Sequence, residues 1–282
     1  MRLITFEAEG GVRHGILRGE PDRGRIVDLG PGDLLRLIES GDLADGPERE
    51  AASVRLLAPL LRPPKLLALA GNYQDHITEG GGKPVDKTRV VPKLFLKPSS
   101  AIVGPEAPLC LPSISSTTDW EVELAVIIGT RCRNVGVDQA LDVVFGYTIA
   151  NDISARTTDW GVQRDENPWN QFFDWLNGKW PDSFAPLGPY ILTADEVPDP
   201  QALDISLDLN GQRQQSSSTR HMIFGVAETI AFASRFMTLE PGDIIETGTP
   251  SGVGAARGMY LKSGDVLEAR IQSLGVLRTP VE

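Results

Sequence analysis

The segment Asp119-Trp-Glu-Val-Glu-Leu-Ala-Val-Ile-Ile-Gly129 decides how this chain folds and where its chemistry lies. Its residues alternate between one face with Glu121 and Glu123 and another with Val122, Leu124, Val126 and Ile128, which predicts a β-strand. Successive side chains of a strand point to opposite faces, so the two glutamates face the same way. Two like charges on one half-buried face repel each other unless a cation lies between them. The segment therefore predicts a strand that presents two carboxylates to a cation.

A third carboxylate follows the next apolar run. Asp152 lies where the strand-like residues 143–149 end, and it can supply a third oxygen ligand. Three carboxylates without a nearby His or Cys favour a hard divalent ion, Mg²⁺ or Mn²⁺ with Ca²⁺ as a further option, over zinc. The spacing alone is equally compatible with glutamates that face solvent beside lysines.

The composition of the whole chain limits the class of protein. With 282 residues, 41% of them hydrophobic, the chain can form a sizeable core. A formal charge of −11 without a Lys/Arg cluster argues against a nucleic-acid partner. No run approaches the roughly 18 apolar residues that a membrane span needs, and the N-terminus lacks a secretory signal pattern. Two cysteines without metal-type spacing favour buried thiols in a reducing cytoplasm over a disulfide. We therefore expect a cytoplasmic protein, and the lack of a long apolar run argues against a membrane partner.

Short apolar runs between turn signals recur along the chain, with few helical patterns, which favours a strand-rich α+β fold. Residues 1–62 are predicted to form a small strand-rich N-terminal domain, and residues 63–282 a second, larger domain. The clearest helical patterns cover 33–39, 137–144 and 223–236. Residues 157–184 combine several aromatic residues with polar ones, and we expect a long loop that acts as a lid or an interface.

Several spaced motifs resemble those of the fumarylacetoacetate hydrolase family. They are Asn72-Tyr-Gln-Asp-His-Ile-Thr-Glu79, Phe95-Leu-Lys-Pro-Ser99, Asp119-Trp-Glu-Val-Glu123, Asn151-Asp-Ile-Ser-Ala-Arg156, Gly178-Lys179 and Glu246-Thr-Gly-Thr-Pro-Ser-Gly-Val-Gly254. The resemblance covers about residues 64–282. It implies a mixed β-roll or sandwich catalytic domain, metal ligation by Glu121, Glu123 and Asp152, and a homodimer.

His76 and Glu79 are three residues apart, so on a helical turn their side chains are neighbours. A carboxylate beside an imidazole raises the imidazole pKa and orients the ring, which suits a general base. The same spacing also occurs on ordinary surface helices. The resemblance implies that this pair is the catalytic dyad of a lid, and the glycines at 80–82 permit the lid to move.

The resemblance also implies roles for residues around the substrate. Arg156 borders the pocket, and Asp159 stands where relatives usually carry Gln, which suggests a different substrate. Lys179 meets a substrate oxygen near the metal, where an ammonium stabilises an enolate or oxyanion, although most loop lysines simply face water. Thr249 contacts the substrate carboxylate, in a Gly-rich segment whose backbone can bind anions or simply turn between strands.

These residues predict an enzyme for a small anionic oxo acid that chelates the metal. The leading hypothesis is hydrolysis of a carbon–carbon bond in a 2,4-diketo acid, such as an acylpyruvate or a fumarylpyruvate-like compound. The alternative is decarboxylation, tautomerisation or isomerisation of a 2-oxo dicarboxylate such as oxaloacetate. A lyase or dehydratase acting on a sugar acid, and a non-catalytic metal-stabilised protein, are further alternatives.

Overall fold

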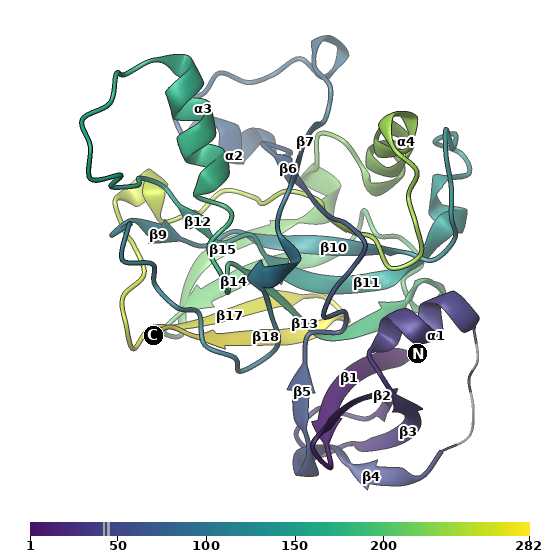
Figure 1. Cartoon of the computed structure of the whole chain (residues 1–282). Helices are drawn as coiled ribbons and strands as arrows, with labels where there is room; N and C mark the ends of the chain where they lie inside the picture. Colours follow the sequence, from purple (N-terminus) through teal and green to yellow (C-terminus); the bar gives the residue numbers. More distant parts are fainter. Residues whose placement is uncertain (42, 44–45) are drawn as a thin grey trace.

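Strand β10 (Val122–Ile128) forms over the residues that the alternation predicts. The computed structural model describes residues 1–41, 43 and 46–282. In it, β10 pairs with β11 (Val144–Asn151) along one edge and with β16 (Ile244–Glu246) along the other. Every residue of β10 is buried, and the strand lies in the middle of the molecule (Figure 1). The segment that carries the glutamates is therefore an interior strand.

A large mixed sheet runs through the molecule. Its other strands are β1 (Arg2–Ala8), β2 (Gly11–Arg18), β3 (Arg25–Pro31), β4 (Glu48–Glu50), β5 (Arg55–Leu57), β6 (Leu66–Ala70), β7 (Lys93–Leu96), β8 (Ile102–Val103) and β13 (Ala185–Thr193). Within the described residues the order is β4-β3-β2-β1-β13-β11-β10-β16-β6-β7, with β5 beside β1 and β8 beside β13. Only the β16–β6 and β13–β8 pairs of these are parallel.

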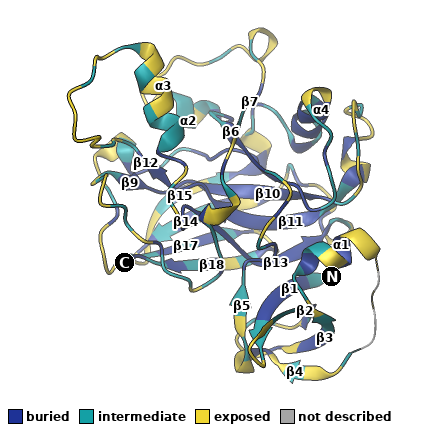
Figure 2. Ribbon diagram, viewed as in Figure 1, coloured by how far each residue is buried: buried dark blue, intermediate teal, exposed yellow. Residues whose placement is uncertain are grey.

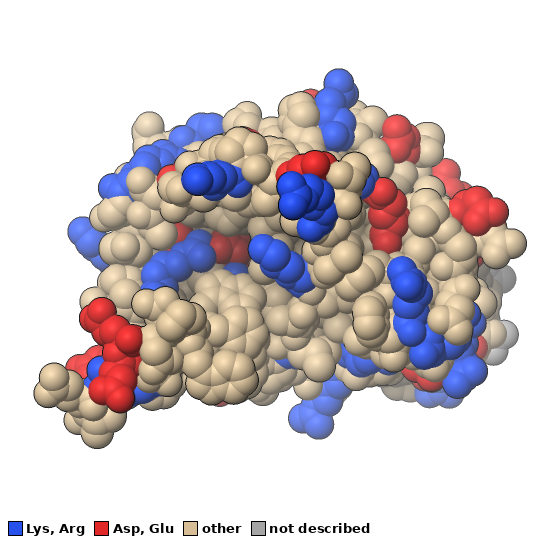
Figure 3. All heavy atoms as spheres, turned by 90° about the horizontal axis from the view of Figure 1, so that it is seen from above, with Lys and Arg blue, Asp and Glu red and all other residues tan. Residues whose placement is uncertain are grey.

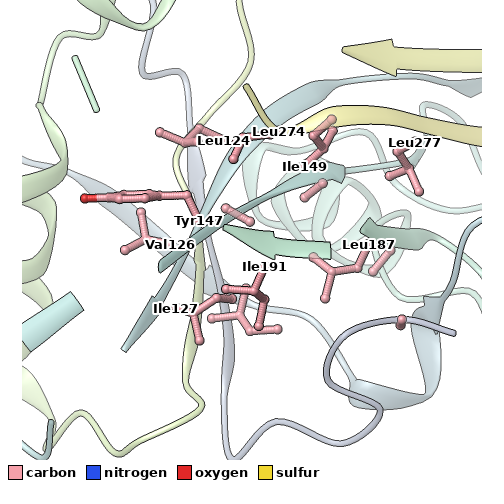
Figure 4. Close-up of a cluster of buried hydrophobic side chains, with 14 of the residues drawn as sticks. Leu124, Val126, Ile127, Tyr147, Ile149, Leu187, Ile191, Leu274 and Leu277 are labelled. Atoms are coloured by element: carbon pink, nitrogen blue, oxygen red, sulfur yellow. The ribbon is translucent and has the colours of Figure 1, made fainter. Parts of the chain in front are cut away.

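A second, antiparallel sheet packs against the large one. Its strands, in spatial order, are β15 (Gln212–Ser218), β14 (Asp204–Leu209), β17 (Val266–Ile271) and β18 (Gly275–Pro280). Apolar side chains such as Leu124, Ile149 and Leu277 lie between the two sheets (Figure 4), and the interior is buried throughout (Figure 2). A short pair, β9 (Thr118–Asp119) with β12 (Ser154–Ala155), flanks β10. The predicted strand-rich α+β sandwich is confirmed.

The N-terminal strands join the large sheet rather than forming a sheet of their own. In the β1–β13 pair, Arg2 lies opposite Leu192 and Leu3 lies opposite Ile191. The hydroxyl of Thr5 donates to the carbonyl of Pro59 at 2.6 Å, which ties β1 to the segment that leads into the second part of the chain. The division into residues 1–62 and 63–282 stays a prediction.

The described helices are α1 (Leu34–Ser40), α2 (Gln74–Glu79), α3 (Pro168–Asn177) and α4 (Val226–Phe236). Helices α1 and α4 lie within about three residues of the predicted ranges. The helix predicted over 137–144 is wrong, because only a 3₁₀ turn forms, at Ala140–Val143. There the carbonyl of Val143 accepts from Gly129 N at 2.7 Å and closes the connection from β10 to β11. No described helix has the length and apolar character that a membrane crossing requires.

The loop expected over residues 157–184 is wrong in its middle part, where α3 forms. Asn167 caps α3 by accepting a hydrogen bond from Asn170 N, and Pro168 occupies the first turn, a position that suits proline. The aromatic side chains of α3 remain largely accessible, and Trp169 is 71% exposed. In Figure 1, helices α2 and α3 both lie above the end of the large sheet at which strand β10 begins.

Candidate active site

Three carboxylates meet on one face of the large sheet. The amide of Asp152 donates to the carbonyl of Glu121 at 2.8 Å, and Glu123 lies opposite Ala150 in the same strand pair. Residues that face each other across an antiparallel pair share a face, and so do residues two apart. One carboxylate oxygen from each of Glu121, Glu123 and Asp152 lies within 4.8 Å of the others. The structure thus brings together the three residues that the sequence selects as metal ligands.

Three cationic side chains surround this cluster. Lys179 Nζ donates to Glu121 Oε2 at 2.8 Å and to Asp152 Oδ2 at 2.5 Å. Lys97 Nζ donates to the other oxygen of Asp152 and, at 2.8 Å, to the carbonyl of Phe184. Arg156 bridges Glu121 at 2.5 Å and Asp119 at 2.9 Å. Both lysine side chains are almost completely buried, so the charges interact with little screening by water.

These charges act differently on the two glutamates. Burial alone would raise the pKa of Glu121, but Lys179 and Arg156 outweigh it and hold this pKa below its usual range. Burial, together with the negative charge of Asp152, raises the pKa of Glu123 well above its usual value. Glu123 Oε2 accepts from Gly248 N at 2.6 Å, while its Oε1 has no hydrogen-bond partner in the described structure.

A buried carboxylate oxygen without a donor is costly unless a cation approaches it. The orphaned oxygen of Glu123, next to two further carboxylates, therefore fits a hard divalent cation. A set of oxygen donors alone suits Mg²⁺ or Mn²⁺, and also Ca²⁺, rather than zinc.

The predicted dyad forms on α2. His76 Nδ1 lies 2.9 Å from Glu79 Oε1, and both side chains are about four-fifths buried. The other oxygen of Glu79 accepts from Gly252 N at 2.7 Å, which fixes the carboxylate against the segment after β16. Gly248 N of the same segment donates to Glu123 Oε2, so one loop holds both the dyad and a carboxylate of the cluster. The dyad and the carboxylates thus belong to one site.

Two glycines allow the close approaches that position these groups. A Cβ on Gly178 would lie 2.2 Å from the carbonyl of Ala155, so only glycine fits directly before Lys179. Gly248 has a φ of +91°, and a Cβ there would lie 2.6 Å from Asn72. Asn72 in turn donates to the carbonyls of Phe224 and Thr247 and so anchors the start of α2.

The other two predicted substrate contacts, Thr249 and Asp159, bond to groups outside the carboxylate cluster. The hydroxyl of Thr249 donates to the carbonyl of Val122 at 2.9 Å and accepts from Gln215 at 2.8 Å, so it holds the segment 247–254 against β10. Asp159 is exposed on the loop before α3, where it accepts from Gly161 N. Its carboxylate therefore lies in a different environment from that of Arg156.

The face that carries α2 and α3 is hollowed. Seen from this side, acidic atoms lie inside the hollow, and Lys and Arg atoms surround it (Figure 3). A small anion that enters the hollow therefore meets a positively charged rim, although the chain as a whole carries a formal charge of −11.

The family model described as fumarylacetoacetate (FAA) hydrolase C-terminal matches residues 65–282. The chain belongs to the fumarylacetoacetate hydrolase family. The predicted resemblance is thereby confirmed, and the match begins three residues after the predicted domain boundary at 62.

Members of this family match the chain over nearly its whole length. A mitochondrial oxaloacetate tautomerase of Xenopus laevis is 38% identical over 299 residues, which cover 100% of this chain and 90% of that protein. A 2,4-didehydro-3-deoxy-L-rhamnonate hydrolase of Sphingomonas sp. (strain SKA58) is 38% identical over 290 residues, covering 100% and 96%. A crystal structure of maleylpyruvate hydrolase from Sphingobium sp. SYK-6, in complex with manganese(II) and pyruvate, matches with a TM-score of 0.77 and 33% identity, covering 100% and 98%.

Two residues of the site received no role from the sequence. Lys97 and Glu246 both stand inside motifs that carry the resemblance, and both are buried beside the carboxylates. A charged residue at the end of an apolar, strand-like run is the signal that could have identified them. Such a residue is rarely buried without a charged partner or a ligand.

Proposed function

We propose that this chain is a divalent-metal-dependent enzyme that hydrolyses a carbon–carbon bond of a small 2,4-diketo acid, such as an acylpyruvate or a fumarylpyruvate-like compound. The observation that carries the proposal is the His76–Glu79 pair, held beside a buried cluster of three carboxylates. The similarity to a maleylpyruvate hydrolase crystallised with manganese and pyruvate supports the same substrate class. We also propose that the protein forms a homodimer, as the family resemblance implies, and that it is located in the cytoplasm.

Glu121, Glu123 and Asp152 would hold the cation. When bound, a divalent cation polarises the carboxylate and the 2-oxo group of a chelating substrate. Lys179 shares its ammonium group between Glu121 and Asp152, so it lies where negative charge develops on the substrate. Arg156 and Thr249 border the substrate, and Asp159 lies on the loop that faces its distal end.

The dyad moves the protons. Glu79 holds His76 through Nδ1, so Nε2 is the nitrogen that takes a proton from the attacking water. The water oxygen bonds to the distal carbonyl carbon, and the bond between that carbon and the methylene carbon breaks. Its electron pair passes to the methylene carbon as an enolate, which Lys179 stabilises and to whose carbon His76 delivers the proton that it took from water. The carboxylic acid that forms at the distal carbon loses its remaining proton to solvent. The products are a carboxylate and a 2-oxo acid.

A second candidate function uses the same groups without water. The similarity to an oxaloacetate tautomerase over the full chain favours keto–enol interconversion of a 2-oxo dicarboxylate. In that reaction His76 takes a proton from the carbon next to the 2-oxo group and returns it to oxygen, or the reverse, and no carbon–carbon bond breaks.

Substrate assays with Mg²⁺ and with Mn²⁺ separate these reactions. A set of 2,4-diketo acids and enol-oxaloacetate is incubated with the enzyme, and the products are identified by nuclear magnetic resonance. Two carboxylate products from a diketo acid support the hydrolase, accelerated ketonisation of oxaloacetate supports the tautomerase, and carbon dioxide release indicates a decarboxylase. Retained metal without turnover of any oxo acid contradicts both proposals and favours a non-catalytic protein.

The metal ligands are tested with Glu123→Gln, which keeps the size of the side chain and removes its charge. We expect this variant to lose metal binding and metal-dependent activity while its circular dichroism spectrum stays that of the unmodified chain. Undiminished metal-dependent activity in Glu123→Gln contradicts the assignment.

A further inference from the structure

Glu246 is a fourth carboxylate on the side of the sheet that faces the candidate metal site. It ends β16, opposite Ala125 of β10 on one side and opposite Ala68 of β6 on the other. Paired residues share a face, and Ala125 lies two residues from Glu123, so Glu246 points to the same side as Glu123. Its two strand neighbours offer methyl groups and no hydrogen-bond donor.

The carboxylate of Glu246 lacks a partner in the described part of the chain. The residue is completely buried, and neither Oε1 nor Oε2 has a hydrogen bond. Lys97 is the cation that acts on it most strongly, but the Lys97 ammonium donates to Asp152 and to the carbonyl of Phe184. Burial raises the pKa of Glu246 to about 8 in spite of Lys97. An unpaired buried carboxylate of this kind is costly, so it is expected to serve a ligand.

The charges of the site give an independent argument. At the candidate metal site, five buried carboxylates of the described chain lie among three cationic side chains. The carboxylates are Asp119, Glu121, Glu123, Asp152 and Glu246, and the cations are Lys97, Arg156 and Lys179. When all eight groups are ionised, as a bound cation would favour, five minus three leaves two negative charges, which is the charge that one divalent cation neutralises. Without Glu246, the same cation would leave one positive charge in the interior.

We propose that Glu246 is an outer carboxylate of the metal site, which accepts hydrogen bonds from the hydration water of a cation held by Glu121, Glu123 and Asp152. The proposal rests on the metal site of the proposed function. Glu246 is not part of the group whose oxygens lie within 4.8 Å of one another, so it acts across water rather than as a direct ligand. Mg²⁺ in particular keeps several of its waters when a protein binds it.

The test measures binding of Mn²⁺ alone to the full-length protein after chelation, by calorimetry and by water-proton relaxation. Glu246→Gln keeps the size of the side chain and removes its charge. We expect its affinity for Mn²⁺ to fall by about 10- to 100-fold, the effect typical of groups that hold a ligand of the metal in place. The number of water molecules on bound Mn²⁺ should stay unchanged. A rise in that number would mean that Glu246 is a direct ligand, which would overturn the outer role.

A matched control removes the same charge elsewhere. Glu268→Gln on β17 lies in the second sheet, where its partner is Arg270, and should leave Mn²⁺ affinity unchanged. Thermal unfolding gives a further readout: in Glu246→Gln the increase in Tm on adding Mn²⁺ should shrink, while the Tm of the metal-free protein should not fall. A purely structural role predicts an equal fall of Tm with and without the metal.

Comparison with Glu123→Gln, and with a second variant at position 246, separates this inference from the assignment of the metal site itself. If Glu123→Gln abolishes Mn²⁺ binding and Glu246→Gln does not change it, Glu246 has no role in the site and only this inference is wrong. If Glu123→Gln still binds Mn²⁺ normally, the metal site is wrong. Glu246→Met, which buries no unpaired amide, should weaken binding as much as Glu246→Gln. Failure of both Glu246 variants to fold would show a structural role and overturn the proposal.

Discussion

At the scale of single residues, His76 is the side chain on which the proposed chemistry depends. We expect His76→Ala to lower kcat by about 10²- to 10⁴-fold, the range for a positioned general base, because the variant removes the imidazole that Glu79 orients to take the proton. Its affinity for Mn²⁺ should stay unchanged, since His76 is not a metal ligand. Steady-state kinetics and calorimetry on the same preparation check both expectations.

The neighbouring residues of α2 supply the comparison. Glu79→Gln should cause a smaller loss than His76→Ala, because Glu79 orients the imidazole and does not itself transfer the proton. Thr78→Ala, on the exposed side of the same helix, should leave kcat unchanged. Equal turnover in His76→Ala and the unmodified chain, together with an inactive Glu123→Gln, would show that the histidine is an ordinary surface residue.

At the scale of elements, α2 is fastened to the segment that follows β16. Ser251 Oγ donates to Asp75 Oδ2 at 2.7 Å, and Gly252 N donates to Glu79. These two hydrogen bonds lie on either side of His76 in the helix. They hold the dyad at the carboxylates, so they determine the fraction of molecules in which His76 is positioned for catalysis.

Ser251→Ala removes one of these bonds. A hydrogen bond of this kind contributes about 1 kcal/mol, so we expect kcat to fall by roughly five-fold while Mn²⁺ affinity stays the same. Asp75→Ala also removes the hydrogen bond that Asp75 Oδ1 accepts from His76 N, so it should lose at least as much as Ser251→Ala. The double variant should lose no more than Asp75→Ala, because Ser251 acts through its contact with Asp75. Ser53→Ala, which loses an exposed hydrogen bond to the carbonyl of Glu50, is the control. Additive losses would contradict the shared contact.

The elements differ in how well the sequence predicts them. The bounds of β10 follow directly from alternation, because a strand buried between two neighbours carries an uninterrupted pattern. Helix α3 was missed because its aromatic side chains are spread over an exposed surface, although Asn167-Pro168 is a recognisable helix start. Lys97 and Glu246 were missed for another reason: their importance comes from sheet register, which brings together strands distant in the sequence.

At the scale of the whole molecule, the N-terminal strands complete the large sheet. A chain of residues 63–282 alone would expose the edge of β13 that pairs with Arg2 and Leu3. An open sheet edge with apolar neighbours promotes association. We therefore expect this truncated chain to aggregate or to unfold at a lower temperature than the full chain, as measured by light scattering and thermal unfolding. A monodisperse truncated chain with an unchanged Tm would show that the two parts fold independently.

The place of β16 between β10 and β6 also affects how the protein forms during synthesis. A growing chain that has not yet reached Glu246 has β11 beside β10 on one edge, while the edge that β16 later covers is open. Chains emerge from the ribosome N-terminus first, so the carboxylates of the site are made long before the sheet around them closes. A product that terminates before Glu246 therefore carries the acidic residues without the enclosed site. We expect the cation to bind only after the chain has extended past Glu246.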